Sequence, residues 1–137
     1  MSDYKINIEM ILEMVNIEEI DIGSSKAGPY SHAIKAENYI FISGQVPAPD
    51  KIGIRSQTLS ALEKIKQILE KAEAKVSNIV KTTIYLRNMS DFTIMNESYK
   101  SFFIQNGIKE KYPARTTVEA KCPLEKALIE IDAIAVT

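Results

Sequence analysis

Residues 128–135 alternate between two kinds of side chain so regularly that they predict a β-strand with one wholly apolar face. One face carries Leu128, Glu130, Asp132 and Ile134, and the other carries Ile129, Ile131, Ala133 and Ala135. The run 113–119 also alternates, and we interpret the two runs as neighbouring strands. A strand with an apolar face has to be covered by a second layer of structure, and this requirement limits the possible folds.

Each of these two strands carries a charged residue that needs an explanation. Arg115 lies in the first run and Glu130 in the second, and a charge in a half-buried strand requires a partner, a ligand or solvent. A guanidinium group can hold a small carboxylate through two parallel hydrogen bonds. A nearby glutamate can act on a water molecule as a general base. The pair therefore fits a small-molecule site, and the alternative is a structural salt bridge or a solvated strand face.

The bulk properties of the chain argue against several classes of protein. The 137 residues carry a formal net charge of -1, from 17 basic and 18 acidic residues, and no basic cluster is long enough to follow a phosphate backbone. No apolar run approaches the roughly 18 residues needed to cross a bilayer. Asp3, Glu9 and Glu13 make the N-terminus unlike a targeting peptide. We therefore expect a cytoplasmic protein with no nucleic-acid or membrane partner.

Cysteine and histidine are too scarce for two common kinds of site. The single cysteine, Cys122, excludes an intrachain disulfide bond and fits a reducing compartment. One cysteine and one histidine cannot form the usual Cys/His zinc site, so we expect no metal. The sequence contains no glycine-rich phosphate loop and no recognisable Ser/His/Asp set, and we expect no cofactor.

The remaining pattern predicts an α+β fold. We expect a strand at 16–22, a hairpin of 33–36 and 39–43, a helix from an N-cap at Ser56 to about residue 75, a strand at 79–86, a helix from Ser90 or Asp91, and the two strands already described. The apolar stripes of the helices are Leu59, Leu62, Ile65, Ile68, Leu69 and Ala72, then Phe92, Met95, Tyr99, Phe102 and Phe103. This pattern predicts one sheet with both helices on one face, so the other face meets solvent or another subunit.

The first residues of the chain do not share this pattern. Residues 1–14 fit a strand and a helix equally well, because their apolar residues satisfy both periodicities. We assign residues 1–14 to an N-terminal extension and residues 15–137 to one folded domain, which agrees with the length of the chain.

Six short segments follow one another along the chain. They are Gly28-Pro29-Tyr30-Ser31, Phe41-Ile42-Ser43-Gly44-Gln45-Val46-Pro47, Val80-Lys81-Thr82-Thr83-Ile84-Tyr85-Leu86, Met95-Asn96-Glu97-Ser98-Tyr99, Pro113-Ala114-Arg115 and Ile129-Glu130-Ile131. In this order and spacing they resemble the RidA (reactive intermediate deaminase A, or YjgF-like) family over nearly the whole chain. The resemblance implies a chorismate-mutase-like α+β fold, with one mixed β-sheet and two α-helices packed on one face. It also implies a homotrimer with active sites between subunits.

The resemblance implies roles for the two charged residues. Arg115 would bind the carboxylate of a 2-imino acid, and Glu130 would position or activate the hydrolytic water. The implied activity is that of a 2-iminobutanoate/2-iminopropanoate deaminase, which hydrolyses enamines and imines such as those from 2-aminoacrylate to 2-oxo acids and ammonia. One alternative is a non-catalytic trimer that binds or senses small molecules. Another is an endoribonuclease or translation inhibitor, which the near-zero net charge does not favour.

Four further positions match the family's site. Tyr30 and Ser43 would line the pocket, and the alternatives are packing of the loop and a strand-end hydrogen bond. Asn96 would have a structural or pocket role, with a surface amide as the alternative. Thr117 stands where the family often has cysteine, so we expect only its backbone carbonyl to orient a water molecule.

Three positions depart from the family's pattern. Thr116 stands where serine is common, and Cys122 lies in a loop whose Leu-Pro order differs, where we expect a thiol near the surface or an interface. His32 replaces the glutamine that usually follows Gly-Pro-Tyr-Ser, and we expect it to be a surface or hydrogen-bonded residue rather than a catalyst. None of these departures removes Arg115 or Glu130.

Overall fold

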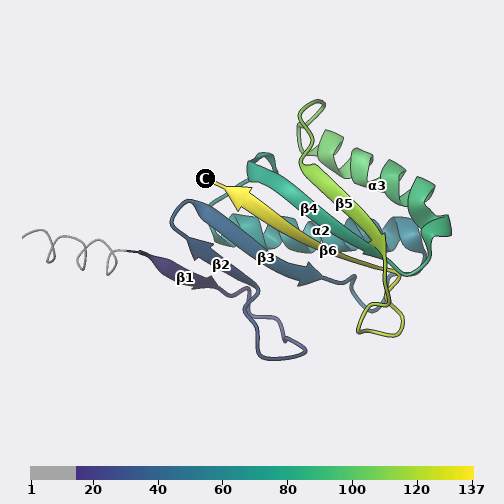
Figure 1. Cartoon of the computed structure of the whole chain (residues 1–137), viewed down its shortest axis with the longest axis horizontal. Helices are drawn as coiled ribbons and strands as arrows, with labels where there is room; N and C mark the ends of the chain where they lie inside the picture. The colour runs from purple at the N-terminus through teal and green to yellow at the C-terminus, as the bar shows by residue number, and fades with distance from the viewer. Residues whose placement is uncertain (1–14) are drawn as a thin grey trace, which may run out of the picture.

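The strands and helices that the patterns predict assemble as Figure 1 shows. The computed structural model describes residues 15–137, and the predicted extension at 1–14 lies outside the described residues. The strands are β1 (Ile17–Ile20), β2 (Ala33–Ala36), β3 (Tyr39–Gln45), β4 (Ile79–Leu86), β5 (Ala114–Glu119) and β6 (Ile129–Val136). The helices are α2 (Ile54–Lys71) and α3 (Phe92–Gln105), and short 3-10 turns at Val76–Asn78 and Met89–Asp91 precede β4 and α3.

The six strands form one mixed sheet in the order β1-β2-β3-β6-β4-β5. β4 and β5 are parallel, with α3 in the connection between them, and all other neighbouring strands are antiparallel. The predicted α+β fold, with one mixed sheet and two helices, is therefore confirmed. The prediction that the Arg115 and Glu130 strands are neighbours is wrong, because β5 and β6 both pair with β4, which lies between them. Alternation identifies a strand but not its partner.

Helix α2 begins earlier than the predicted N-cap at Ser56. Gly53, with a φ of 85°, lets the chain turn into the helix, and the Ser56 hydroxyl instead donates a hydrogen bond to the Ile52 carbonyl at 2.6 Å. The helix ends at Lys71 rather than near residue 75, because the positive φ of Glu73 (59°) turns the chain toward β4. No helix in residues 15–137 combines the length and the apolar character needed to cross a membrane.

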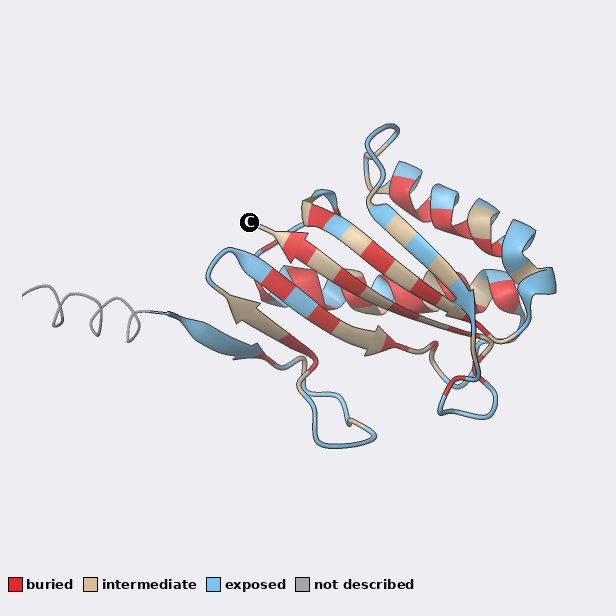
Figure 2. Cartoon of the chain, in the orientation of Figure 1, coloured by how far each residue is buried: buried red, intermediate tan, exposed pale blue. Residues whose placement is uncertain are grey.

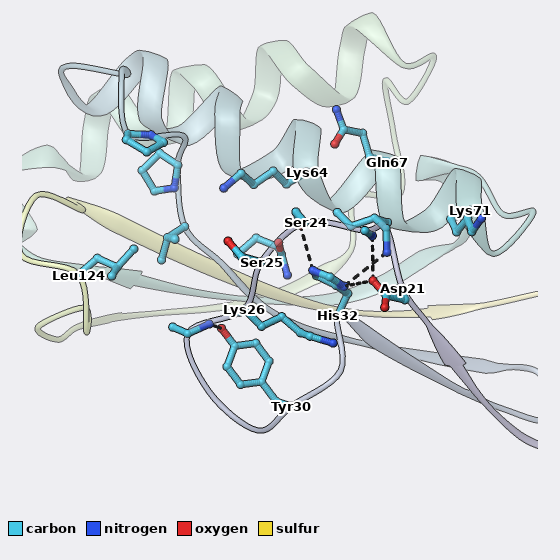
Figure 3. A pocket seen from close by; sticks show the side chains of 18 of the residues that line it. Asp21, Ser24, Ser25, Lys26, Tyr30, His32, Lys64, Gln67, Lys71 and Leu124 are labelled. Carbon is cyan, nitrogen blue, oxygen red and sulfur yellow. Dashed lines mark hydrogen bonds and ion pairs between the residues drawn. The ribbon is translucent and has the colours of Figure 1, made fainter.

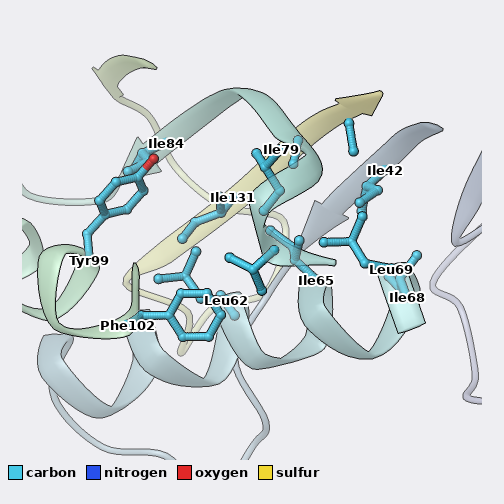
Figure 4. Close-up of a cluster of buried hydrophobic side chains, with 14 of the residues drawn as sticks. Ile42, Leu62, Ile65, Ile68, Leu69, Ile79, Ile84, Tyr99, Phe102 and Ile131 are labelled. Atoms are coloured by element: carbon cyan, nitrogen blue, oxygen red, sulfur yellow. The ribbon is translucent and has the colours of Figure 1, made fainter. Parts of the chain in front are cut away.

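The hydrophobic core lies between the sheet and the two helices (Figure 4). The predicted apolar face of β6 is buried, with side chains at most 1% exposed. The helices contribute the predicted stripes, of which Leu62, Ile65, Ile68 and Leu69 of α2 and Met95, Tyr99, Phe102 and Phe103 of α3 are buried. Phe92 departs from the prediction, since it is 37% exposed. These contacts hold both helices on the same face of the sheet.

The other face of the sheet is left open by the described part of the chain. Ile40 and Ile42 point from β3 into the core, so the alternating residues Tyr39 and Phe41 point the opposite way and are 50% and 46% exposed. Their rings stack with centroids 6.2 Å apart. Figure 2 shows the resulting alternation of buried and more exposed residues along the central strands. Exposed apolar side chains grouped in this way are typical of a surface that contacts another protein.

Candidate active site

Arg115 lies on the helix-covered face of the sheet, at the edge next to α3. In the parallel pairing of β4 and β5 it stands opposite Thr82, whose side chain is buried beneath the helices. The guanidinium carbon lies 5.0 Å from the ring centre of Tyr99 and 5.8 Å from that of Phe92. A cation–π contact stabilises a guanidinium group by about 0.5–2 kcal/mol, depending on its exposure. Phe92 therefore packs against Arg115 instead of entering the core.

Of the two rings that contact Arg115, that of Tyr99 is the more firmly held. The sequence had indicated only a core residue at this position. Its side chain is buried, and its hydroxyl lies 2.9 Å from Thr82 Oγ1. Burial raises the pKa of Tyr99, so the phenol stays neutral at pH 7. Arg115 is half-buried, and its guanidinium group forms no ion pair within residues 15–137. Its N–H donors are therefore oriented by the rings and available to a ligand.

Two unpaired polar oxygens lie on the same side of the molecule. Oδ1 of Asn96 and Oγ1 of Thr117 are buried and have no hydrogen-bond partner among the described residues. Thr117 follows Arg115 by two positions in β5 and so shares its face of the sheet. Asn96 lies four positions after Phe92 and three before Tyr99, so it shares the helix face that carries the guanidinium. An unpaired buried polar group costs about 1–3 kcal/mol, so these atoms fit a site for a ligand or water.

Glu130 lies on the opposite, open face of the sheet. Its partner in β4 is Tyr85, three positions from Thr82, and alternation puts these two side chains on opposite faces. The Glu130 side chain lies directly over Gly44, where an added Cβ would be 2.7 Å from Oε2. The absence of a side chain at Gly44 is therefore what admits the carboxylate. Burial raises the pKa of Glu130, and the charge of Asp132 raises it further.

Tyr30 and Ser43 lie around the same glycine. Tyr30 and Gly44 line one open cavity of about 1100 Å³, which Figure 3 shows. The Tyr30 hydroxyl accepts a hydrogen bond from the Ala27 N–H at 3.1 Å, which orders the ring and leaves the phenol proton to donate. The Ser43 hydroxyl donates to the Ser31 carbonyl at 2.6 Å. The strand-end hydrogen bond considered as the alternative for Ser43 is thus present.

The predicted site residues form two separate groups in one chain. We call Arg115, Asn96 and Thr117 the Arg115 half-site, and Glu130, Gly44, Tyr30 and Ser43 the Glu130 half-site. Because β4 lies between β5 and β6, the two charged strands are about 10 Å apart, and the two charges are on opposite faces. No ion pair joins Arg115 to Glu130, so the structural salt bridge considered above is not formed. A site that uses both charges requires more than one copy of the chain.

A second polar group brings a serine, a histidine and an aspartate together, although no motif in the sequence predicted it. Oγ of Ser24 lies 3.0 Å from Nε2 of His32, and Nδ1 of His32 lies 3.2 Å from Oδ1 of Asp21. His32 is hydrogen-bonded, as expected, but it is buried rather than on the surface. The three residues have no motif-like spacing, so the only signal in the sequence was the histidine itself.

Residues 15–137 contain neither a cluster of metal ligands nor an exposed thiol. Among residues 15–137, no three His, Cys, Asp or Glu side chains come close enough to hold a metal ion. Cys122 is buried, at 7% exposure, and burial raises the pKa of its thiol. The thiol form therefore predominates at neutral pH, which makes Cys122 a poor nucleophile.

Comparison with known proteins shows the family to which the chain belongs. A family model described as Endoribonuclease L-PSP matches residues 23–137. The chain belongs to this family. A RutC family protein of Buchnera aphidicola is 47% identical over 110 residues, which cover 79% of this chain and 86% of that protein. A protein of Escherichia coli K12 named 2-iminobutanoate/2-iminopropanoate deaminase is 37% identical over 114 residues, which cover 80% of this chain and 88% of that protein.

The fold agrees with the same assignment. The crystal structure of the YjgF gene product of Escherichia coli matches with a TM-score of 0.79 and 33% sequence identity, and the match covers 87% of this chain and 98% of that one. The resemblance to the RidA or YjgF-like family, drawn above from six short segments, is therefore confirmed.

Replacement of Gly44 by alanine should displace the Glu130 carboxylate, since the new methyl group would lie 2.7 Å from Oε2. Because the contacted atoms belong to the end of a flexible side chain, we expect the main effect in the position of Glu130 and a loss of stability below the about 1–3 kcal/mol of overpacking in a rigid core. The matched control is Gly28→Ala, whose methyl group would lie 3.7 Å from the Tyr30 ring, an ordinary contact. Urea denaturation and crystal structures of both variants test the expectation. A Gly44→Ala protein with parental stability and an unmoved Glu130 would contradict it.

Proposed function

We propose that this protein hydrolyses small 2-imino acids, and the enamines that tautomerise to them, to 2-oxo acids and ammonia. The observation that supports this most directly is the Arg115 half-site, in which a half-buried guanidinium lies on aromatic rings beside two unpaired polar oxygens. The activity named for the Escherichia coli relative supports the same reaction. The Glu130 half-site of a second copy would complete the site.

Arg115 would bind the substrate carboxylate. A guanidinium group and a carboxylate form two parallel charge-assisted hydrogen bonds, which fix the orientation of the ligand. Contact with Tyr99 and Phe92 already restricts the arginine side chain, so little conformational entropy is lost on binding. The unpaired Oδ1 of Asn96 would accept a hydrogen bond from the imine or enamine nitrogen. The Thr117 hydroxyl or carbonyl would hold the attacking water.

Glu130 would act as the base for this water. The water oxygen bonds to the electrophilic C=N carbon while one of its protons passes to Glu130 and the imine nitrogen takes a proton from solvent. The tetrahedral adduct then collapses: the C=O bond forms as the hydroxyl proton returns to solvent, and the C–N bond breaks as Glu130 gives its proton to the nitrogen, which leaves as ammonia. Burial raises the pKa of Glu130, which makes its carboxylate a stronger base than an exposed glutamate. Positioning of the water against the bound imine would supply much of the remaining acceleration.

A homotrimer would bring the two half-sites together. The Arg115 half-site lies at the sheet edge formed by β5, and the Glu130 half-site lies on the open face. Packing the β5 edge of one copy against the open face of the next would join them and would cover the exposed rings of Tyr39 and Phe41. The only partners in this proposal are the substrate and other copies of the chain, and a cytoplasmic location stays a prediction.

Two other functions are alternatives that the experiments below distinguish from imine hydrolysis. A non-catalytic trimer that senses 2-oxo or 2-imino acids would use the Arg115 half-site for binding but would not need Glu130 as a base. The family description names an endoribonuclease. The net charge of -1 and the single histidine give that activity no electrostatic or acid–base support in this chain.

Arg115→Ala should lower kcat/KM sharply and should weaken the binding of a stable 2-oxo acid. Loss of one charge-assisted hydrogen bond costs about 1.5–3 kcal/mol, or about ten- to a hundredfold in affinity, and loss of two costs more. Arg115→Lys should restore little, because a point ammonium cannot reproduce the planar fork. The measurements are steady-state hydrolysis of an imine generated in situ and titration of the 2-oxo acid. Parental kinetics in folded, assembled Arg115→Ala would exclude the binding role.

Glu130→Gln should lower kcat and leave the affinity for the 2-oxo acid close to that of the parent. In the parent, activity should fall as the pH drops through the raised pKa of Glu130, because protonation removes the base. The variant should lack this acid limb in its pH profile. Unchanged turnover in the folded variant would rule out Glu130 as the base. A parent that binds the 2-oxo acid through Arg115 but hydrolyses no imine would be a sensor.

Mixing the two inactive variants should restore activity if the site lies between copies. In trimers assembled from equal amounts of Arg115→Ala and Glu130→Gln chains, about one interface in four joins an intact Arg115 half-site to an intact Glu130 half-site. We therefore expect about a quarter of the parental turnover after co-expression or refolding of the mixture. The matched control is the same mixture with a chain carrying both substitutions in place of Arg115→Ala, which should restore nothing.

The mixing experiment also has a clear negative result. If mixed trimers form, as native mass spectrometry of differently tagged chains would show, and activity does not return, the two residues do not act across an interface. A protein that is only monomeric at micromolar concentration would exclude the shared site directly.

A further inference from the structure

The loop between β1 and β2 brings together three polar side chains that the imine reaction does not use. Oγ of Ser24 lies 3.0 Å from Nε2 of His32, and Nδ1 of His32 lies 3.2 Å from Oδ1 of Asp21 (Figure 3). The Gly23 N–H donates to the same Asp21 oxygen at 2.8 Å and so fixes the carboxylate. We call Ser24, His32 and Asp21 the Ser24 trio.

The partners of His32 indicate which ring nitrogen carries the proton. The hydrogen bond from Gly23 lowers the pKa of Asp21, so this carboxylate is ionised at neutral pH and can only accept hydrogen bonds. We assign the proton to Nδ1, which lies 3.2 Å from Asp21 Oδ1, and Nε2 then accepts the proton of the Ser24 hydroxyl. The Ile22 N–H also approaches Nδ1, but at 3.4 Å this contact is long for a hydrogen bond. The tautomer is the one in which a histidine can activate a serine.

The surroundings of Ser24 suit a nucleophile. Ser24 is exposed and lines the cavity of about 1100 Å³, whereas the His32 ring behind it is buried. Lys64 and Gln67 of α2 line the same cavity (Figure 3). Within residues 15–137, the main-chain N–H of Ser24 donates to no other backbone group, and in the proposed reaction it would stabilise the developing oxyanion.

We propose that the Ser24 trio is a second catalytic centre, which hydrolyses small carboxylic esters through an acyl-serine intermediate. Ser24 is the nucleophile, His32 is the general base and then the general acid, and Asp21 holds the imidazole in its tautomer. Lys64, on the cavity wall, favours esters that carry a negative charge.

The steps conserve atoms and charge. Oγ of Ser24 bonds to the ester carbonyl carbon while its proton passes to Nε2 of His32. The tetrahedral oxyanion collapses, the bond to the alcohol oxygen breaks, and His32 gives its proton to the departing alcohol. Water then attacks the acyl carbon and gives a proton to His32, and the acid leaves as that proton returns to Ser24. One ester and one water yield one acid and one alcohol.

The Ser24 trio shares its cavity with Tyr30 and Gly44 of the Glu130 half-site, but its reacting atoms are different ones. Its three residues belong to the loop that joins β1 to β2 and to the residue just before β2, whereas Arg115 and Glu130 belong to β5 and β6. A loop that is only anchored by hydrogen bonds would show the same distances. The decisive property is therefore the reactivity of the Ser24 oxygen.

A fluorophosphonate probe measures this reactivity on the full-length protein. Its phosphorus bonds to an activated serine oxygen as fluoride leaves, and peptide mass spectrometry locates the modified residue. We expect the label on Ser24 in the parent and in the matched control Ser25→Ala, which removes the adjacent exposed serine. Ser24→Ala and His32→Gln should not be labelled at this peptide.

Turnover of p-nitrophenyl acetate measures the complete reaction. General-base catalysis contributes about 10²–10⁴-fold, so Ser24→Ala and His32→Gln should lose about a hundredfold or more, while Ser25→Ala keeps the parental rate. Oligomeric state and imine hydrolysis should be parental in Ser24→Ala, which removes only one exposed hydroxyl. Absence of label on Ser24, or equal ester turnover in Ser24→Ala and Ser25→Ala, would overturn the proposal and leave the trio as a loop anchor. If the parent hydrolyses no imine, the proposed function fails, but the test of ester hydrolysis is unaffected.

Discussion

The pairing of β4 with both β5 and β6 is the constraint on which the rest of the arrangement depends. β4 presents Thr82 next to Arg115 on the helix side and Tyr85 next to Glu130 on the open side. Two charges whose strands the sequence predicts to be neighbours are therefore separated by a whole strand and by the thickness of the sheet. In the proposed reaction, a single chain would bind the carboxylate through Arg115 or activate water through Glu130, but could not do both to one substrate. Any reaction that needs both charges on one substrate links activity to association.

Both half-sites contain groups whose burial costs free energy in the single chain. The unpaired oxygens of Asn96 and Thr117 each forgo a hydrogen bond, at a cost of about 1–3 kcal/mol. Burial also disfavours the charge of Glu130, as the direction of its pKa shift shows. The core of isoleucine and leucine side chains between the sheet and the helices offsets these costs. Buried polar groups without a partner, next to a guanidinium group that aromatic rings hold in place, are stronger evidence for a ligand site than an exposed polar cleft is.

The sequence predicts the layers of the fold better than the partners of its strands. Alternation reports burial directly, and the apolar face of β6 is buried as expected. The position of β5 is set by the crossover through α3, which no local pattern encodes. The N-cap at Ser56 was wrong because the positive φ of Gly53 starts the helix earlier. Phe92 left the predicted core because a guanidinium group at its ring offers an alternative to apolar burial.

The candidate site was predictable as a set of residue types but not as a spatial grouping. Arg115 and Glu130 stand out in sequence as charges in half-buried strands, and their faces become known only from the register with β4. The Ser24 trio was missed because the conformation of a loop, rather than a periodic spacing, brings its members together. The half-sites depend on sheet register, and the trio depends on that loop. A substitution at His32 should therefore remove the proposed ester hydrolysis while β4 still holds Arg115 and Glu130 in place.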